Sequence, residues 1–249
     1  MKTTENTVLV TGAGTGMGLE MAKLLSQAGN TVIMVARNEE RLTKEAAQLK
    51  NAFPIACDLA DEQALRSLVL RVRHEFKDLN VILLNAGMAT NYALLGPENA
   101  FEHGKAEMTT NYHSAVYLTQ EFESLLADKP EAAMILTTSG VVLAPDMNHP
   151  TYSATKAALH SLILSLRQML VRKKSSIKVF ELMMPLVDTP FAKGIKADNK
   201  MSPAEAAAHM MQGLAKDEYE MHIGITADLY ATFLRSPEEA MRVVNAITG

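Results

Sequence analysis

The stretch that decides the fold is Thr7-Val8-Leu9-Val10-Thr11-Gly12-Ala13-Gly14-Thr15-Gly16-Met17-Gly18. Its first five residues are β-branched or apolar and predict a strand over Thr7–Thr11. The apolar spacing that follows predicts a helix over Met17–Ala28, which Gly29 ends. A strand, a glycine-rich turn and a helix in this order can bind a pyrophosphate, because glycines let the backbone come close and the helix N-terminus offers free N–H groups.

The spacing of the glycines distinguishes between two known nucleotide-binding patterns. The common dinucleotide pattern G-x-G-x-x-G does not fit from Gly12, because its last glycine would fall on Met17. The pattern T-G-x-x-x-G-x-G does fit, through Thr11, Gly12, Gly16 and Gly18. Taken alone, such a turn can also be a glycine-rich loop without a ligand.

Downstream of this unit, short apolar runs alternate with helical patterns. Strands are predicted over Thr31–Ala36, Phe53–Cys57, Val81–Leu84, Ala133–Thr138, Ile177–Met183 and Tyr219–Ile225. Helices are predicted over Glu39–Lys50, Glu62–Phe76, Glu107–Leu126, Tyr152–Arg172 and Pro203–Leu214, and a mobile loop over Met184–Met201. Such alternation is typical of an α/β fold, so we expect one Rossmann-type domain over 1–249: a doubly wound parallel sheet of about seven strands with helices on both faces.

Composition excludes several classes of protein. The net charge of −4 comes with no long run of one sign, so neither nucleic acid nor an anionic membrane is an expected partner. The single cysteine, Cys57, rules out an intrachain disulfide framework and fits a reducing compartment. With no signal peptide and no apolar stretch that could span a bilayer, the expectation is a cytoplasmic protein. The histidines and Cys57 lack metal-ligand spacing, so no metal is expected.

The end of the second predicted strand bears on cofactor choice. Enzymes selective for NAD usually carry an acid here to accept from the ribose hydroxyls. This chain has Val35-Ala36-Arg37-Asn38, with no acid at the strand tip. A guanidinium suits a phosphate dianion, so Arg37, with help from Asn38 or Thr15, is predicted to bind the 2′-phosphate of NADP. The alternative is a solvated arginine at a helix start.

The segment Tyr152-Ser153-Ala154-Thr155-Lys156 carries the clearest chemistry. Tyr152 and Lys156 are four residues apart, so on a helix they share one face. A nearby ammonium favours the phenolate, which lets Tyr152 exchange a proton with a carbonyl or alcohol oxygen. Lys156 is also placed to hold the ribose of a nicotinamide. Taken alone, Y-x-x-x-K also occurs on ordinary surface helices.

Two further polar residues support that interpretation. Ser139 follows the strand Ala133–Thr138, at the edge where open α/β sheets bind ligands, and its hydroxyl can donate to a substrate carbonyl. Taken alone, a serine in this position is more often a turn residue beside a glycine such as Gly140. Asn111 lies within the predicted helix Glu107–Leu126, where asparagine needs specific hydrogen bonds. It is interpreted either as a relay member that holds a water near Lys156 or as a structural amide.

Together these residues resemble the short-chain dehydrogenase/reductase family. The landmarks occur in order: the Thr11–Gly18 turn, Asp58 after the third strand, Asn85-Ala86-Gly87, Asn111, Ser139, and Tyr152 with Lys156. The resemblance spans about residues 5 to 190. The segment from Tyr152 to Thr189 also looks like a bacterial branch associated with teichoic-acid D-alanylation operons.

The resemblance implies a catalytic tetrad of Asn111, Ser139, Tyr152 and Lys156 and a nicotinamide cofactor, which the end of the second strand predicts to be NADP(H) rather than NAD(H). It implies cofactor contacts from Thr11, Gly12, Gly14, Thr15, Gly16, Met17, Gly18, Arg37, Asn38, Asp58, Leu59, Asn85, Ala86, Gly87, Tyr152, Lys156, Pro185, Val187 and Thr189. The family usually has Pro-Gly where this chain has Pro185-Leu186, which puts the local backbone and the fit near the nicotinamide in doubt.

The function expected is hydride transfer between NADP(H) and a small carbonyl or alcohol substrate. The rivals are a cofactor-binding sensor on the same fold and a scaffold that binds no cofactor. The substrate pocket is expected from Met88–Leu95, Val141–Pro150 and Pro190–Met201. Within it, Asp146 and His149 are interpreted as loop residues with a possible place at the substrate mouth. The resemblance also implies a homodimer or homotetramer that pairs the helices Glu107–Leu126 and Tyr152–Arg172. The apolar stripes of these helices are equally suited to packing on the chain's own sheet.

Overall fold

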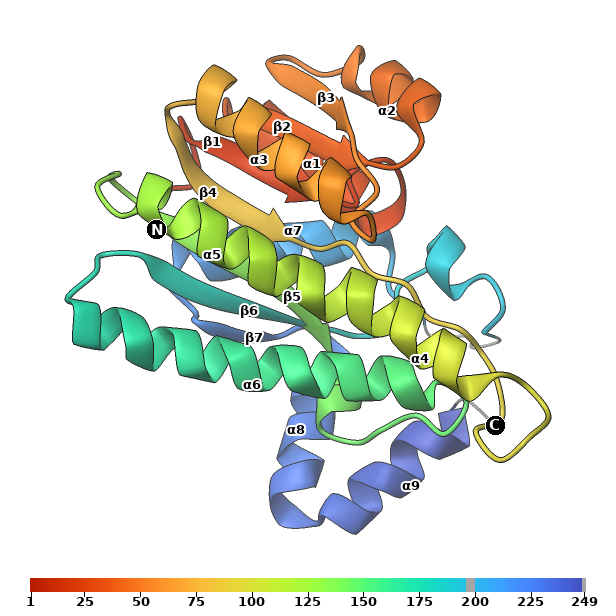
Figure 1. Cartoon of the computed structure of the whole chain (residues 1–249). Coiled ribbons are helices and arrows are strands. Elements are labelled where there is room, and N and C mark those ends of the chain that lie inside the picture. The colour runs from red at the N-terminus through yellow and green to blue at the C-terminus, as the bar shows by residue number, and fades with distance from the viewer. Residues whose placement is uncertain (196–199, 248–249) are drawn as a thin grey trace.

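The computed structural model describes residues 1–195 and 200–247, and this part forms a parallel sheet of seven strands in the order β3-β2-β1-β4-β5-β6-β7 (Figure 1). The strands are β1 Thr7–Thr11, β2 Thr31–Ala36, β3 Ala52–Ala56, β4 Leu79–Leu84, β5 Ala133–Ser139, β6 Lys178–Met184 and β7 Glu220–His222. The chain winds outward from β1 in one direction to β3 and then in the other direction from β4 to β7. The predicted doubly wound fold is confirmed, and its switch point lies between β1 and β4, where such sheets bind ligands.

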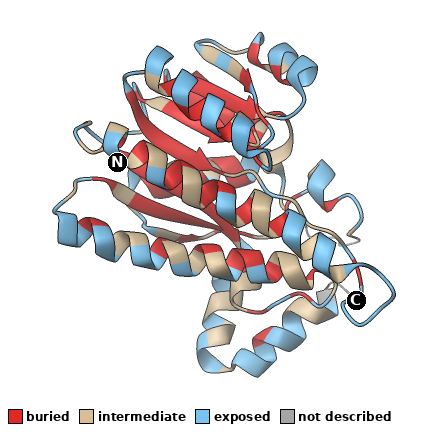
Figure 2. Ribbon diagram, viewed as in Figure 1, coloured by how far each residue is buried: buried red, intermediate tan, exposed pale blue. Residues whose placement is uncertain are grey.

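Helices cover both faces of the sheet. One face carries α1 Gly16–Gln27, α2 Glu39–Ala46 and α7 Pro203–Ala215, and the other carries α3 Glu62–Glu75, α5 Ser114–Leu126 and α6 Pro150–Lys173. Successive strand residues divide between the two cores: Val8 and Val10 pack on the α1 side, and Leu9 between them packs on the α3 side. Because both sides are covered, the central strands are buried along their length, as their continuous apolar sequences predict (Figure 2).

Several element ends differ from the prediction. Helix α2 stops at Ala46 rather than Lys50, because the chain turns through Asn51, with a φ of 53°, to enter β3. The predicted strand Tyr219–Ile225 is limited to Glu220–His222, because Gly224, with a φ of 58°, turns the chain into α8 Ile225–Arg235. Turns of this kind are not visible in the helical or strand periodicity of the sequence.

The predicted helix Glu107–Leu126 is the second part of a longer one. Helix α4, Ala100–Met108, begins at Asn99, whose side chain accepts a hydrogen bond from Glu102 N. It continues through a π-helical turn, Thr109–His113, directly into α5. A π turn inserts one extra residue and often marks a functional position, and Asn111 lies at its centre.

The C-terminal region forms a hairpin of α8 and α9, Pro237–Ile247, which extends beyond the edge where the strands end (Figure 1). The predicted loop Met184–Met201 contains one short 3-10 turn, Pro190–Ala192, and a bridge between Val187 and Met201. Residues 196–199 of that loop lie outside the described residues. Among the described helices, none is long and apolar enough to cross a membrane.

Candidate active site

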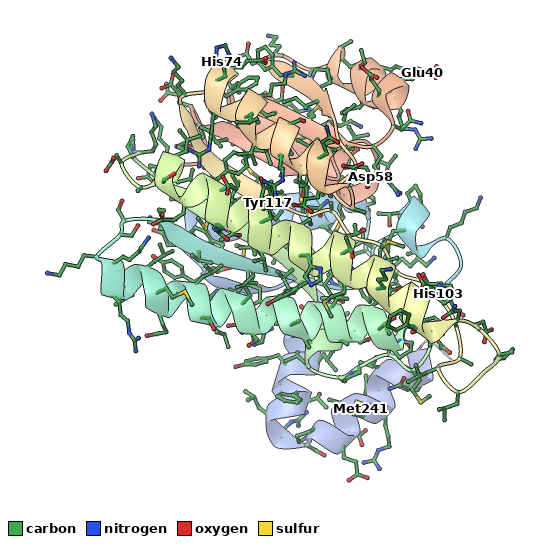
Figure 3. All side chains as sticks on the ribbon, in the orientation of Figure 1. Glu40, Asp58, His74, His103, Tyr117 and Met241 are labelled. Carbon is green, nitrogen blue, oxygen red and sulfur yellow. The ribbon has the colours of Figure 1, made fainter. Side chains whose placement is uncertain are left out.

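A cavity of about 640 Å³ runs along the carboxyl ends of the strands. It is bordered by most of the predicted site residues, namely Gly12, Gly14, Thr15, Gly16, Met17, Gly18, Arg37, Asn38, Asp58, Leu59, Asn85, Ala86, Gly87, Ser139, Tyr152, Lys156, Pro185, Val187 and Thr189. Asp58 marks its β3 side (Figure 3). Thr11 and Asn111 do not border the cavity. Both make hydrogen bonds beside it.

The glycine turn leaves the start of α1 open to a ligand. Gly12 and Gly16 have φ values of 71° and 57°, which other residues adopt at a cost. A Cβ on Gly18 would lie 2.3 Å from Gly12 O, so this position admits only glycine. Thr15, the N-cap of α1, makes no side-chain cap and the first turn holds no acid, whereas Asn38 caps α2. The uncapped N–H groups fit a cofactor's pyrophosphate.

Thr11 connects two strands rather than bordering the cavity. Its Oγ1 accepts hydrogen bonds from Asn85 N at 3.0 Å and from Ala86 N at 3.1 Å. The Asn85 side chain donates back to Thr11 O at 3.3 Å. These bonds join the ends of β1 and β4, so Thr11 shapes the crevice without lining it.

Two arginines lie at the end of β2. Arg37 borders the cavity there, and so does Arg41, in the first turn of α2. Both are exposed to solvent. The Asn38 side chain accepts from Arg41 N at 2.8 Å, so it caps α2 while also bordering the cavity. Sequence reasoning missed Arg41, although its spacing from Arg37 was a signal.

Ser139, Tyr152 and Lys156 meet at the other end of the cavity. Ser139 ends β5, and Tyr152 and Lys156 come from the first two turns of α6. Lys156 Nζ lies 5.7 Å from the centroid of the Tyr152 ring. Burial raises the pKa of Tyr152, a hydrogen bond with Ser139 lowers it, and the negative charge of Glu107 raises it. The ammonium of Lys156 was expected to favour the phenolate form of Tyr152. The effect of burial on the pKa is larger, so the hydroxyl stays protonated at neutral pH.

Lys156 is almost fully buried, with 3% of its surface exposed. Its Nζ donates to the Thr137 carbonyl at 2.8 Å. Burial lowers the pKa of Lys156 to about 8, and the negative charge of Glu181 opposes that change. Lys156 is therefore still mostly an ammonium at pH 7, close to the point at which it loses its proton.

The Asn111 side chain joins the segment after β4 to helix α6. Its Oδ1 accepts from Met88 N at 2.8 Å, and its Nδ2 donates to Met88 O at 2.9 Å and to Thr155 Oγ1 at 3.0 Å. A Cβ built on Gly87 would meet Asn111 Oδ1 at 3.5 Å and Lys156 Nζ at 3.6 Å. Asn111 thus holds the chain after β4 against α6, beside Lys156, and its side chain serves the structural role that was one of the two interpretations.

Comparison with known proteins identifies the family. The family model for short chain dehydrogenases matches residues 6–200. The chain belongs to the short-chain dehydrogenase family. An oxidoreductase of Bacillus subtilis (strain 168) named DltE, itself uncharacterised, is 41% identical over 190 residues, which cover 76% of this chain and 74% of the relative. This match confirms the resemblance to a particular bacterial branch.

Solved structures agree on the fold. A short-chain dehydrogenase from Burkholderia cenocepacia J2315 in complex with NADP superposes with a TM-score of 0.86 at 20% identity and covers 98% of this chain and 99% of its own. One from Burkholderia phymatum in complex with NAD gives the same TM-score at 16% identity, with 100% and 98% covered. The fold therefore accepts either cofactor, and side chains must decide between them.

The departure from the short-chain dehydrogenase pattern at Leu186 causes no backbone strain. Leu186 is not among the described residues with positive φ, so the chain does not need a glycine there. Its carbonyl accepts from Met201 N at 3.0 Å, which joins these two positions of the chain. Thr189 faces the glycine turn, since a Cβ on Gly16 would lie 3.1 Å from Thr189 Cβ. The two sides of the expected cofactor channel therefore approach each other closely.

Two buried carboxylates behind the site were not predicted. Glu107 accepts from Thr90 N at 2.6 Å and from Thr151 Oγ1 at 2.5 Å. Glu181 accepts from Thr138 Oγ1 at 2.5 Å and from His160 Nδ1 at 2.9 Å. The signal for Glu181 was a lone charge within the apolar run of β6. Because His160 lies one turn after Lys156, α6 brings both groups to the same face of the sheet.

The His160–Glu181 pair should make stability depend on pH. The hydrogen bond to Glu181 raises the pKa of His160 above its ordinary value of 6.5. Its proton therefore stabilises the folded state fully below pH 6.5, and this stabilisation is lost as pH rises through the higher folded pKa. We expect His160→Gln to lower the free energy of unfolding by about 1 kcal/mol more at pH 6 than at pH 9. Urea unfolding at both pH values measures this, and equal losses would contradict it.

Proposed function

We propose that this chain is an NADP(H)-dependent oxidoreductase that interconverts a carbonyl and an alcohol, with Tyr152 as its general acid and base. The observation that carries the proposal is the meeting of Ser139, Tyr152 and Lys156 at one end of a cavity whose other end holds an uncapped helix N-terminus and two arginines. The first group suits proton exchange with a carbonyl oxygen, and the second suits the phosphates of a dinucleotide.

Each residue has a distinct part in the reaction. A bound nicotinamide would supply the hydride. Tyr152, kept protonated by burial, donates its proton to the substrate oxygen in the reductive direction. Ser139 donates a hydrogen bond to the same oxygen as negative charge develops there. The Lys156 ammonium stabilises the phenolate that remains and is placed to hold the ribose, while Asn111 keeps the neighbouring backbone in position.

Support for NADP over NAD comes from the end of β2. Arg37 and Arg41 border the cavity, and no acid stands at the strand tip. Two guanidinium groups suit a 2′-phosphate, whereas NAD-selective sites of this fold usually offer a carboxylate to the ribose. We propose that the other predicted cofactor residues that line the cavity also contact the bound nucleotide.

We also propose that the protein is a cytoplasmic homo-oligomer. Helix α6 exposes Leu164, Met169 and Val171, and the first and last of these lie seven residues apart on one side of the helix, where apolar groups suit burial against a second copy. The pairing of helices that the family resemblance implies would use α6 in this way.

The function is tested by incubating the purified chain with NADPH and a panel of aldehydes and ketones while absorbance at the nicotinamide band is followed. NADPH binding is measured in parallel by fluorescence. We expect saturable binding and consumption of NADPH with at least one class of carbonyl. Binding without turnover on a broad panel would favour a sensor, and no binding would favour a scaffold.

A further inference from the structure

Asp146 and His149 form a buried pair in the wall of the cavity. They are 5% and 7% exposed, and His149 Nδ1 lies 2.8 Å from Asp146 Oδ2. Both border the same cavity as Ser139 and Tyr152. Burying two ionisable groups in a loop is costly, and here the cost is offset by hydrogen bonds that hold the pair in place, including the one that Asp146 Oδ1 accepts from Asn148 N at 2.9 Å. Such a pair beside a reaction centre is therefore a candidate for binding the substrate.

The loop that carries the pair is held from two sides. On the α6 side, Asp146 N donates to Ser153 Oγ at 3.1 Å, and Ser153 N donates to His149 O at 2.9 Å. On the α9 side, Asn245 Oδ1 accepts from Met147 N at 2.8 Å and Asn245 Nδ2 donates to Pro145 O at 3.1 Å. These bonds give the His149 ring a fixed place, as a recognition group requires.

His149 lies close to Tyr152 along the chain. It is the N-cap of α6, and Tyr152 follows three residues later in the first turn of that helix. Three residues of helix rise by about 4.5 Å, so their backbones lie close together along the helix axis. A substrate oxygen held by His149 would therefore be near the carbonyl oxygen that Tyr152 meets.

The free ring nitrogen defines the chemistry. Asp146 occupies Nδ1, and none of the hydrogen bonds between described residues uses Nε2. A neutral ring that donates Nδ1–H to a carboxylate presents Nε2 as an acceptor, which suits a hydroxyl group. The nearby wall includes the apolar residues Val141, Leu229 and Val244. In an apolar pocket, a few placed polar groups fix the orientation of the ligand.

We infer that His149, oriented by Asp146, binds a hydroxyl group beside the reacting carbonyl, so that the preferred substrates are α-hydroxy ketones. This inference rests on the proposed function. In the reductive direction the ketone carbon gains the hydride of NADPH, its oxygen gains the proton of Tyr152, and the products are a 1,2-diol and NADP⁺. The α-hydroxyl group is unchanged, and His149 acts as a binding residue only.

The test compares two ketones of matched shape with NADPH as the reductant. 2-Hydroxyacetophenone and propiophenone differ only by a CH₂OH group in place of CH₂CH₃. We expect the wild-type protein to favour the hydroxy ketone in kcat/KM. In His149→Phe this preference should fall by up to about 10-fold, since the hydrogen bond between the neutral ring and the hydroxyl group is lost. Asp146→Asn should reduce it as well, because the ring loses its fixed tautomer.

Controls separate this inference from the proposed function. His74 lies in the last turn of α3, far from Asp58 and the cavity (Figure 3). His74→Gln should therefore keep the wild-type preference for the hydroxy ketone. Melting temperature and NADPH affinity report whether each variant is folded, and Asp146→Asn carries the test if His149→Phe is not. A wild-type protein that reduces other carbonyls without preferring the hydroxy ketone would overturn the inference alone, as would a preference that both variants retain. Failure to reduce any carbonyl would overturn the proposed function.

Discussion

Replacing Tyr152 with phenylalanine is expected to lower turnover at least about 1000-fold, because the variant keeps the ring but loses the only group proposed to donate a proton to the substrate oxygen. The ring contacts should survive: the Tyr152 ring lies 5.6 Å from that of Phe191, and Lys156 lies above it. We therefore expect the dissociation constant for NADPH to change only a few-fold. Steady-state kinetics and a fluorescence titration measure the two quantities separately.

The matched control is Tyr117→Phe, the same change on α5 away from the cavity border (Figure 3). It should leave turnover close to that of the wild type. If Tyr152→Phe also retained near-normal activity, Tyr152 would have no part in the chemistry. If it lost NADPH binding to the same degree as turnover, its role would be cofactor binding rather than proton transfer.

Replacing Arg37 with aspartate is expected to weaken NADPH binding at least about 100-fold, because a charge-assisted contact to the 2′-phosphate is replaced by repulsion. NADH lacks that phosphate, so its dissociation constant should change only a few-fold. Titration of both nucleotides against both proteins gives the change in the ratio of the two constants.

Lys44→Asp is the control for long-range charge effects. It makes the same change of charge in α2 at an exposed position outside the cavity border. We expect a small loss of NADPH affinity, reduced further by added salt. If Arg37→Asp weakened the binding of NADPH and of NADH equally, Arg37 would not be a residue that recognises the 2′-phosphate.

Local sequence was sufficient to predict most of the fold. The strands β1 and β2 were predicted to the residue, because their apolar runs are flanked by glycine or polar residues that end them sharply. The end of α2 and the extent of β7 were not predicted well. These ends are set by single residues with positive φ, Asn51 and Gly224, and their effect on the chain is not visible in helical or strand periodicity.

The site was predictable where a local motif carries it or where a residue, such as Ser139, follows a predicted strand or matches a landmark of the family. Tyr152 and Lys156 share a helix face, and the glycine turn is contiguous, so motif spacing found both. The contacts between distant segments had no such signal: Asn111 clamps Met88, and Glu181 binds His160 across two elements. The Asp146–His149 pair was visible as a pair of residues, but its burial depends on Ser153 and on Asn245 in α9.

The central claim is that this chain transfers a hydride from a bound nicotinamide to a carbonyl carbon. The most direct measurement uses NADPH that carries deuterium at both C4 positions, a panel of carbonyls, and mass spectrometry of the alcohols formed. We predict one deuterium on the carbinol carbon with the wild-type protein and a loss of labelled alcohol with Tyr152→Phe. NADPH that binds at saturation yet leaves every carbonyl unlabelled and unreduced would contradict the claim.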